Sequence, residues 1–145
     1  MALAVAPTPN DPAGRSDAAR VLVRLIAGVF GAIVLACGAT AGLIVVAHRP
    51  EWWSGWVAAT AISVIAALLA MAPLAPALWA SVQYAAYGYL GGAVLRMIAS
   101  VLGGLAAVMI FRTPPMPTLL MLAPPYLAQV AAEALVLGRF FWPRG

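Results

Sequence analysis

Apolar residues dominate four long stretches of the chain, and short polar segments separate them. The stretches cover Leu25–Ala47, Trp56–Trp79, Gly88–Phe111 and Thr118–Leu137. A helix that crosses the hydrocarbon core of a bilayer needs about 20 predominantly apolar residues, so each stretch is long enough for one crossing. The pattern predicts an all-α integral membrane protein whose transmembrane helices form an antiparallel four-helix bundle.

The boundary between the second and third stretches is the least marked. No charged residue lies between Trp52 and Leu95, and one helix over these positions would be about 66 Å long, roughly twice the hydrocarbon thickness. We therefore expect a turn within Ala80–Tyr87, which holds a polar cluster. In the fourth stretch, Pro124–Pro125 are expected either to kink the helix or to start it afresh.

The transmembrane domain is expected to cover residues 21–142. Residues 1–20 are expected to form a disordered cytoplasmic tail, and residues 143–145 a short C-terminal tail. The first residues have too short an apolar run and no basic start, which argues against a signal peptide. A lipoprotein signal ending at a lipidated Cys37 is the alternative for this region, but the residues after Cys37 stay apolar, whereas those of a mature lipoprotein would be polar. We therefore expect Cys37 to be a small buried side chain.

Arginine residues predict the orientation, because the cytoplasmic ends of membrane spans carry an excess of basic residues. With four spans, the side that holds both termini carries more arginines than the opposite side, where Arg49 and Arg112 lie. This distribution places both termini in the cytoplasm. The arginines on the side of the termini are Arg15, Arg20, Arg24, Arg139 and Arg144.

Composition excludes several classes of protein. Hydrophobic residues make up 65% of the chain and charged residues only 8%, whereas soluble domains carry roughly 25% charged residues. The net charge is +4, but the basic residues are scattered singly along the chain, which argues against nucleic-acid binding. The chain has one cysteine and one histidine, so we expect no disulfide framework, no Cys/His metal site and no cofactor.

Two ionisable residues remain at membrane depth, Arg96 in the third stretch and Glu133 in the fourth. A charge at the centre of a membrane helix costs about 2.5–3.5 kcal/mol on insertion scales, so each residue should find a partner or water. Both lie equally far from the middle of the expected turn at Arg112–Pro117, and antiparallel helices with the same rise then place them at the same depth. We therefore expect them to contact each other, as a structural pair or as a functional one. If they do not, Arg96 should snorkel to the interface.

Small and polar residues form stripes on these spans. The third span carries a stripe with a spacing of four, the fourth a polar stripe with spacings of three and four, and these stripes are expected to face each other. Ser100, Tyr126 and Gln129 thereby join the charged pair as candidate contacts to a partner or an ion. In the first span, two glycines four residues apart would also allow another helix to pack closely. The stripes are Gly88, Gly92, Arg96 and Ser100, then Tyr126, Gln129 and Glu133, and in the first span Gly38 and Gly42.

Enzymatic activity is not expected from this chain. No aspartate lies in any span, and no serine or cysteine has a base at a matching depth, so acyl transfer and proteolysis lack their groups. A single buried carboxylate is also too few oxygens for a Mg²⁺ or Ca²⁺ site.

The chain resembles the ATP synthase protein I family, which consists of small four-span proteins encoded beside bacterial F-type ATP synthase subunits. The resemblance covers about Val21 to Phe141 and is carried by the segment Gly92–Arg96 and by Pro125-Tyr126 followed by Gln129 and Glu133. It implies a non-enzymatic helper for assembling the rotor ring of c subunits, with a proposed link to Mg²⁺ supply. Arg96 would then be the embedded basic residue that meets a c-subunit carboxylate. Unlike many members, this chain has no basic residue in the turn between the second and third spans.

These features, taken with the resemblance, predict an accessory or assembly factor of a bacterial inner membrane that acts by helix–helix contacts. Its expected partners are the lipid bilayer, ATP synthase c or a subunits, and further copies of itself. The alternative is a small oligomeric ion transporter or channel subunit that uses the pair of Arg96 and Glu133. A third class, a structural scaffold, would use the glycine faces without the charges.

Overall fold

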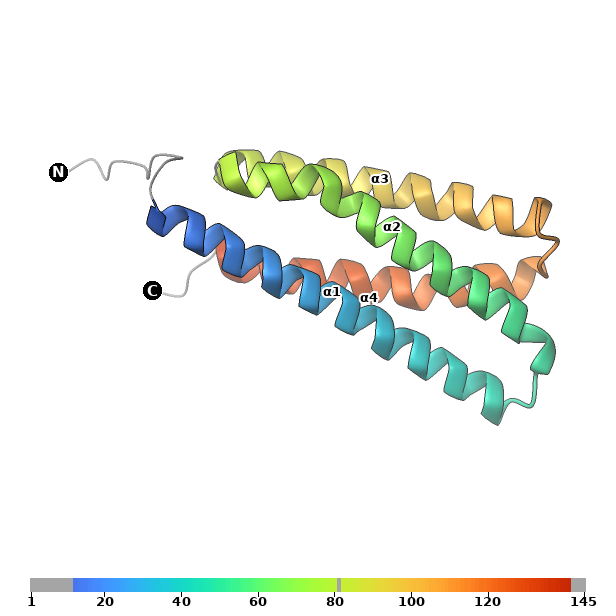
Figure 1. The fold of residues 1–145 in the computed structure, drawn as a ribbon. Coiled ribbons are helices and arrows are strands. Elements are labelled where there is room, and N and C mark those ends of the chain that lie inside the picture. The colour runs from blue at the N-terminus through green and yellow to red at the C-terminus, as the bar shows by residue number, and fades with distance from the viewer. Residues whose placement is uncertain (1–11, 81, 142–145) are drawn as a thin grey trace.

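The computed structural model describes residues 12–80 and 82–141, which form four long α-helices running alternately up and down (Figure 1). They are α1 (Pro12–Val46), α2 (Trp53–Ala80), α3 (Val82–Met109) and α4 (Pro115–Phe141), and a 3₁₀ turn η1 (Pro50–Trp52) precedes α2. The predicted all-α antiparallel bundle is confirmed. The α1–α2 and α3–α4 connections lie at one end of the bundle, which we call the loop end.

Four helical segments are long and apolar enough to cross a membrane, one in each of α1, α3 and α4 and one formed by η1 with α2. These segments are Ala19–Val46, Pro50–Ala80, Tyr84–Met109 and Pro115–Gly138. The chain thus has the composition of a multi-pass membrane protein.

Helix boundaries differ in part from the sequence expectations. Residues 12–20, expected in a disordered tail, are helical: α1 begins at Pro12, and proline suits a first helical position because the missing N–H has no helical partner there. Residues 1–11 and 142–145 lie outside the described residues. The turn expected within Ala80–Tyr87 falls at the start of that range, since α2 ends at Ala80 and α3 begins at Val82. Pro124 and Pro125 lie inside a continuous α4, so the fourth span does not restart there.

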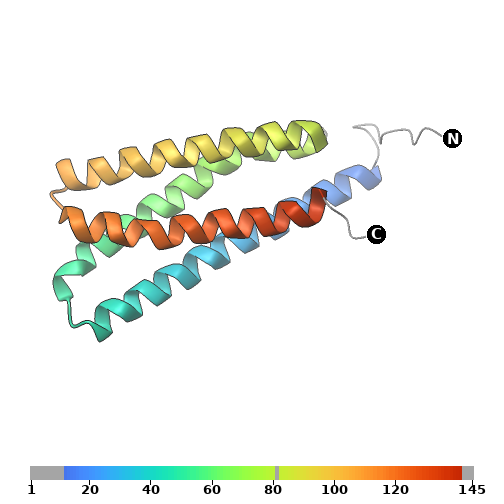
Figure 2. The same cartoon turned by 180° about the vertical axis from the view of Figure 1, so that it is seen from behind.

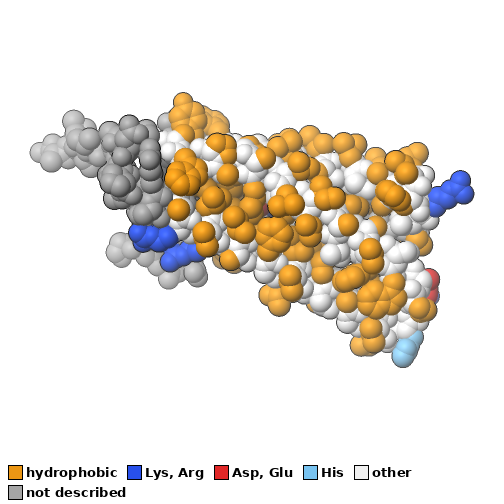
Figure 3. All heavy atoms as spheres, viewed as in Figure 1, with side chains coloured by type: hydrophobic (Ala, Val, Ile, Leu, Met, Phe, Trp, Pro, Cys, Tyr) orange, Lys and Arg blue, Asp and Glu red, His pale blue; other side chains and the backbone are white. Residues whose placement is uncertain are grey.

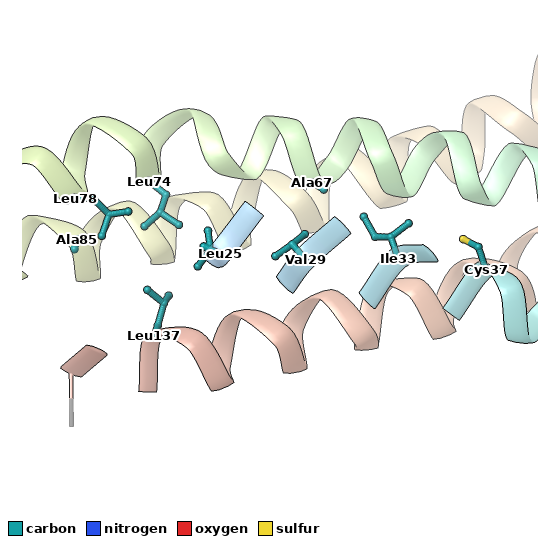
Figure 4. Close-up of a cluster of buried hydrophobic side chains, with 9 residues drawn as sticks. All are labelled: Leu25, Val29, Ile33, Cys37, Ala67, Leu74, Leu78, Ala85 and Leu137. Atoms are coloured by element: carbon teal, nitrogen blue, oxygen red, sulfur yellow. The ribbon is translucent and has the colours of Figure 1, made fainter. Parts of the chain in front are cut away.

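The apolar core is built mainly on one stripe of α1. Leu25, Val29, Ile33 and Cys37 recur every four residues, which places them on one helix face, and all are buried. They point towards small and aliphatic side chains of the other helices (Figure 4). The core partners are Ala67, Leu74 and Leu78 of α2, Ala85 of α3 and Leu137 of α4. Cys37 is a buried free thiol, as expected.

Glycines let α2 and α3 pack most closely of all helix pairs. A Cβ atom built on Gly88 would lie 2.9 Å from the Pro73 carbonyl oxygen, and one on Gly92 would overlap the backbone carbonyl oxygen of Ala70. In contrast, α3 and α4 contact each other least among the packed pairs, and Figure 2 shows α4 lying between α3 and α1. The α3–α4 interface is therefore loose along most of its length.

The surface of the bundle is apolar between its two ends. In the view of Figure 3, hydrophobic side chains cover the flank, while the coloured charged groups lie only at the ends. Large exposed side chains include Leu35 of α1, Leu68 of α2, Leu102 of α3 and Leu135 of α4. Such an exposed apolar belt is the surface that a lipid bilayer covers.

Candidate functional site

Arg96 and Glu133 form a two-pronged ion pair between the middle parts of α3 and α4. The Arg96 Nη1 donates to Glu133 Oε1 at 2.6 Å, and Nη2 donates to Oε2 at 2.8 Å. The Arg96 side chain is 1% exposed and the Glu133 side chain 5%. The predicted contact is present, and Arg96 does not snorkel to the interface. Its fork geometry matches a carboxylate, which strengthens both hydrogen bonds.

The pair is electrically neutral as a unit, and both charged side chains are almost fully buried. A buried pair of this kind contributes little net stability compared with an apolar pair, whereas removal of one partner strands the other charge and costs about 3–5 kcal/mol. The pair therefore holds α3 to α4 at one depth, in an interface that otherwise makes few contacts.

Tyr126 and Gln129 lie on the same stretch of α4 but have different partners. The Tyr126 ring lies 5.8 Å from Arg96 Cζ, within the range of a cation–π contact. The Gln129 Nε2 instead donates to the Ser63 carbonyl oxygen of α2 at 3.2 Å. The polar stripe of α4 thus contacts α3 through Tyr126 and Glu133, and α2 through Gln129.

Two buried polar atoms of this site have no hydrogen-bond partner among the described residues, Arg96 Nε and Gln129 Oε1. One is a donor and the other an acceptor. An unpaired buried polar group costs about 1–3 kcal/mol. The buried polar groups around the ion pair therefore carry a free-energy cost that the pair itself does not remove.

Gly88 and Gly92 of α3 do not face α4, so the expectation that the two stripes face each other was wrong for the glycines of the α3 stripe. Gly88 and Gly92 pack against α2, as described above. The stripe is divided because Gly88 and Gly92 allow α2 to approach closely, while the long Arg96 side chain spans the wider gap to α4. The first-span glycines lie elsewhere: no described heavy atom would lie within 4 Å of a Cβ built on Gly38 or Gly42.

A groove opens on the loop-end side of the ion pair, between α3 and α4. Its volume is about 280 Å³, and it is lined by Ser100 of α3 and by Leu119, Leu122, Ala123, Tyr126 and Leu127 of α4. Ser100 itself is buried and makes no hydrogen bond with Arg96 or Glu133, so it belongs to the groove and not to the ion pair. We call this region, from Arg96–Glu133 to the groove, the α3–α4 seam.

Sequence reasoning missed a second polar contact, which joins α1 to α2. The Trp56 Nε1 donates to the Cys37 carbonyl oxygen and to Thr40 Oγ1, both at 3.0 Å, and the Thr60 hydroxyl lies 3.4 Å from Cys37 Sγ. Trp56 is the first residue of the second apolar stretch, and the N–H of a tryptophan ring usually finds a hydrogen-bond partner when the ring is partly buried. No sequence pattern pointed to the Cys37 carbonyl, because a backbone acceptor has no sequence signature.

The described part of the chain holds no cluster of metal-ligating side chains. No three His, Cys, Asp or Glu side chains come together within these residues in an arrangement that could hold a metal ion.

Comparison with known proteins identifies no relative of this chain. No family model matches it, and neither a curated protein nor a solved structure shows significant similarity.

Proposed function

We propose that this chain is a non-enzymatic accessory protein of a bacterial inner membrane, which acts on a partner helix through the α3–α4 seam. The observation that carries the proposal is the buried fork between Arg96 and Glu133 in the loosest helix interface of the bundle. A purely structural bundle would be equally stable with apolar side chains at both positions. An ion pair in a loosely packed interface can separate and form again, so Arg96 could exchange Glu133 for a carboxyl group of a partner helix.

The exchange we propose keeps the seam neutral throughout. A partner helix brings a protonated carboxyl group beside Arg96, because an ionised one would be costly to hold in the bilayer core. The proton passes to Glu133, and the deprotonated partner carboxylate takes over the two hydrogen bonds from Arg96. The charge count is the same before and after, with one arginine cation and one carboxylate anion. The reverse transfer releases the partner and restores the original pair.

The resemblance to ATP synthase protein I implies the identity of the partner. We propose a c subunit of an F-type ATP synthase, which Arg96 would hold during assembly of the ring. The rival function, an oligomeric ion transporter or channel subunit, needs a charged group that a passing ion can reach. The side chains of Arg96 and Glu133 are 1% and 5% exposed, so no open ion path reaches them within the described bundle, whereas a partner helix would reach them when the loose α3–α4 interface opens.

Site-specific photocrosslinking in native membranes tests the proposal. We would place p-benzoylphenylalanine at Leu127, which lines the groove and is 64% exposed. The matched control position is Leu35, 76% exposed on α1. Each is combined with the native pair or with the double substitution Arg96→Met/Glu133→Leu, which removes both charges together and so strands neither.

The expected result is a crosslink from position 127 to a small membrane protein with a carboxyl-bearing helix, identified by mass spectrometry. It should be lost in the double variant and absent from position 35. If both positions capture only further copies of this chain, with or without the charges, the accessory role is contradicted and a scaffold or channel becomes the better explanation. A crosslink that persists in the double variant would show that the charges are not the contact.

We further propose that both termini lie in the cytoplasm, as the arginine distribution predicts. In a Cys37→Ala background, Ser54→Cys at the loop end should react with a membrane-impermeant maleimide on intact cells. Ala19→Cys at the opposite end should react only after the membrane is permeabilised. The reverse labelling pattern would contradict this orientation.

A further inference from the structure

We infer that the groove between α3 and α4 binds one acyl chain of a glycerophospholipid, whose phosphate lies against Arg112 at the loop end. The inference does not depend on the proposed function. It rests on the shape of the groove, on its apolar lining and on the charge at its membrane-surface end.

The groove has the direction of a lipid chain. Its α4 lining extends from Leu119 to Leu127, a rise of about 12 Å along the helix axis, and its volume is about 280 Å³. Because the bundle axis crosses the bilayer, this line runs along the direction in which acyl chains lie. The groove begins one turn below the start of α4 at Pro115, close to the level where the hydrocarbon core ends.

The lining selects an apolar occupant. Four of the six lining residues are aliphatic, namely Leu119, Leu122, Ala123 and Leu127. An apolar groove of this kind does not hold ordered water, because it offers too few polar partners. An entire helix, with a diameter of about 10–12 Å, would not enter it unless α3 and α4 moved apart. A flexible hydrocarbon chain fits without such movement and gains dispersion contacts along its length.

The headgroup contact follows from the charges at the loop end. Arg112 lies in the turn between α3 and α4 with a left-handed backbone, φ 53°. Its side chain is exposed, and no hydrogen bond or ion pair joins it to another residue of the described chain. Arg49 at the same end already pairs with Glu51 at 3.3 Å. A guanidinium group binds phosphate through two parallel hydrogen bonds, so Arg112 is the cation that a lipid phosphate would meet.

A chain in this groove would also cover Ser100 and Tyr126, which line the groove, and the Tyr126 ring contacts Arg96. The lipid would then have to leave before any helix could reach Arg96. This gives the lipid a place in the proposed exchange, but its binding can be measured without any protein partner.

The test uses the purified full-length protein in vesicles that contain phosphatidylglycerol with a diazirine on its acyl chain. After illumination, the labelled residues are mapped by mass spectrometry. We expect labels to concentrate on residues 119–127 of α4. Ala123→Trp, which fills the groove from an exposed position, should reduce this labelling about tenfold. Ala131→Trp, an exposed position on the same helix outside the groove, is the matched control and should leave it unchanged.

Headgroup variants test the second half of the inference. Arg112→Gln should lower labelling of residues 119–127 about tenfold, because it removes the charged contact with the phosphate, whereas Arg49→Gln should not. Diacylglycerol with the same diazirine lacks the phosphate and should label the groove as weakly as the Arg112 variant labels with phosphatidylglycerol. Phosphatidylethanolamine should behave like phosphatidylglycerol, because both carry the phosphate.

Three results would overturn the inference. Labels spread evenly over the exposed faces of all four helices would mean that lipid only surrounds the bundle. Labelling that survives Ala123→Trp would place the chain elsewhere. Equal labelling by diacylglycerol and phosphatidylglycerol, unaffected by Arg112→Gln, would remove the phosphate contact.

Discussion

Replacing Arg96 alone with methionine tests what the buried ion pair does for stability. Methionine keeps much of the length and volume of the arginine side chain. It leaves Glu133, which as a whole residue is 3% exposed, without its ion-pair partner. Breaking one side of a buried pair costs about 3–5 kcal/mol, and an uncompensated charge at the centre of a membrane helix costs about 2.5–3.5 kcal/mol on insertion scales. Both estimates give a loss of about 3 kcal/mol, a fall of about 100-fold in the ratio of folded to unfolded protein.

The double variant Arg96→Met/Glu133→Leu should recover most of this loss. It has no buried charge, so its free energy of unfolding should lie within about 1 kcal/mol of the native value. The assay is reversible unfolding by sodium dodecyl sulfate in mixed micelles, followed by the fluorescence of the tryptophans. Together with Glu133→Leu alone, the four proteins form a double-mutant cycle that isolates the coupling between the two positions.

A small effect of the single change would refute this reasoning. If Arg96→Met lowers the free energy of unfolding by less than about 1 kcal/mol, Glu133 has access to water or to another partner, and the site is not closed. If the double variant is as unstable as the sum of the single changes, the two side chains act independently and their fork contributes no coupling.

The same unfolding assay checks two further predictions. Gly92→Ala should destabilise the bundle by about 1–3 kcal/mol, because the new Cβ would overlap the backbone carbonyl of Ala70 and the close α2–α3 contact would have to open. Gly38→Ala, whose new Cβ meets no described atom within 4 Å, should instead stabilise the bundle by about 0.5–1 kcal/mol through helix propensity. Equal effects at both positions would contradict the packing described for α2 and α3. Gln129→Leu should change the free energy of unfolding by less than about 1 kcal/mol. It removes the favourable hydrogen bond to the Ser63 carbonyl, but it also removes the cost of the unpaired buried acceptor Oε1. A loss of stability close to that of Arg96→Met would mean that Oε1 has a partner.

The depth match of the two charges was predictable, and so was the number of helices. Apolar length alone separates the four spans, because a bilayer requires about 20 apolar residues for each crossing. Equal rise in the two helices that flank the Arg112–Pro117 turn brings Arg96 and Glu133 to one level, and the cost of an unpaired charge makes contact the favoured arrangement there. These arguments use only distances along the chain.

The assignment of helix faces was not predictable from the chain alone. Gly88 and Gly92 have the same spacing as Gly38 and Gly42, yet the first two are in close contact with α2 and the second two lie open on α1. Gln129 shares the polar stripe of Glu133, yet its amide reaches the Ser63 carbonyl of α2.

The physical reason for this difference is that hydropathy and helical rise are properties of one helix, whereas the choice of face depends on all four helices packing together. A glycine spacing permits a close approach but does not select the neighbour. That choice is made by which surfaces can fit simultaneously: α2 and α3 approach closely through glycine, and α4 is left at the distance that an arginine and a glutamate can span. The residues of the α3–α4 seam can be read from the sequence. Only the tertiary structure decided that the stripe on α3 contacts α2 through its glycines and α4 through Arg96.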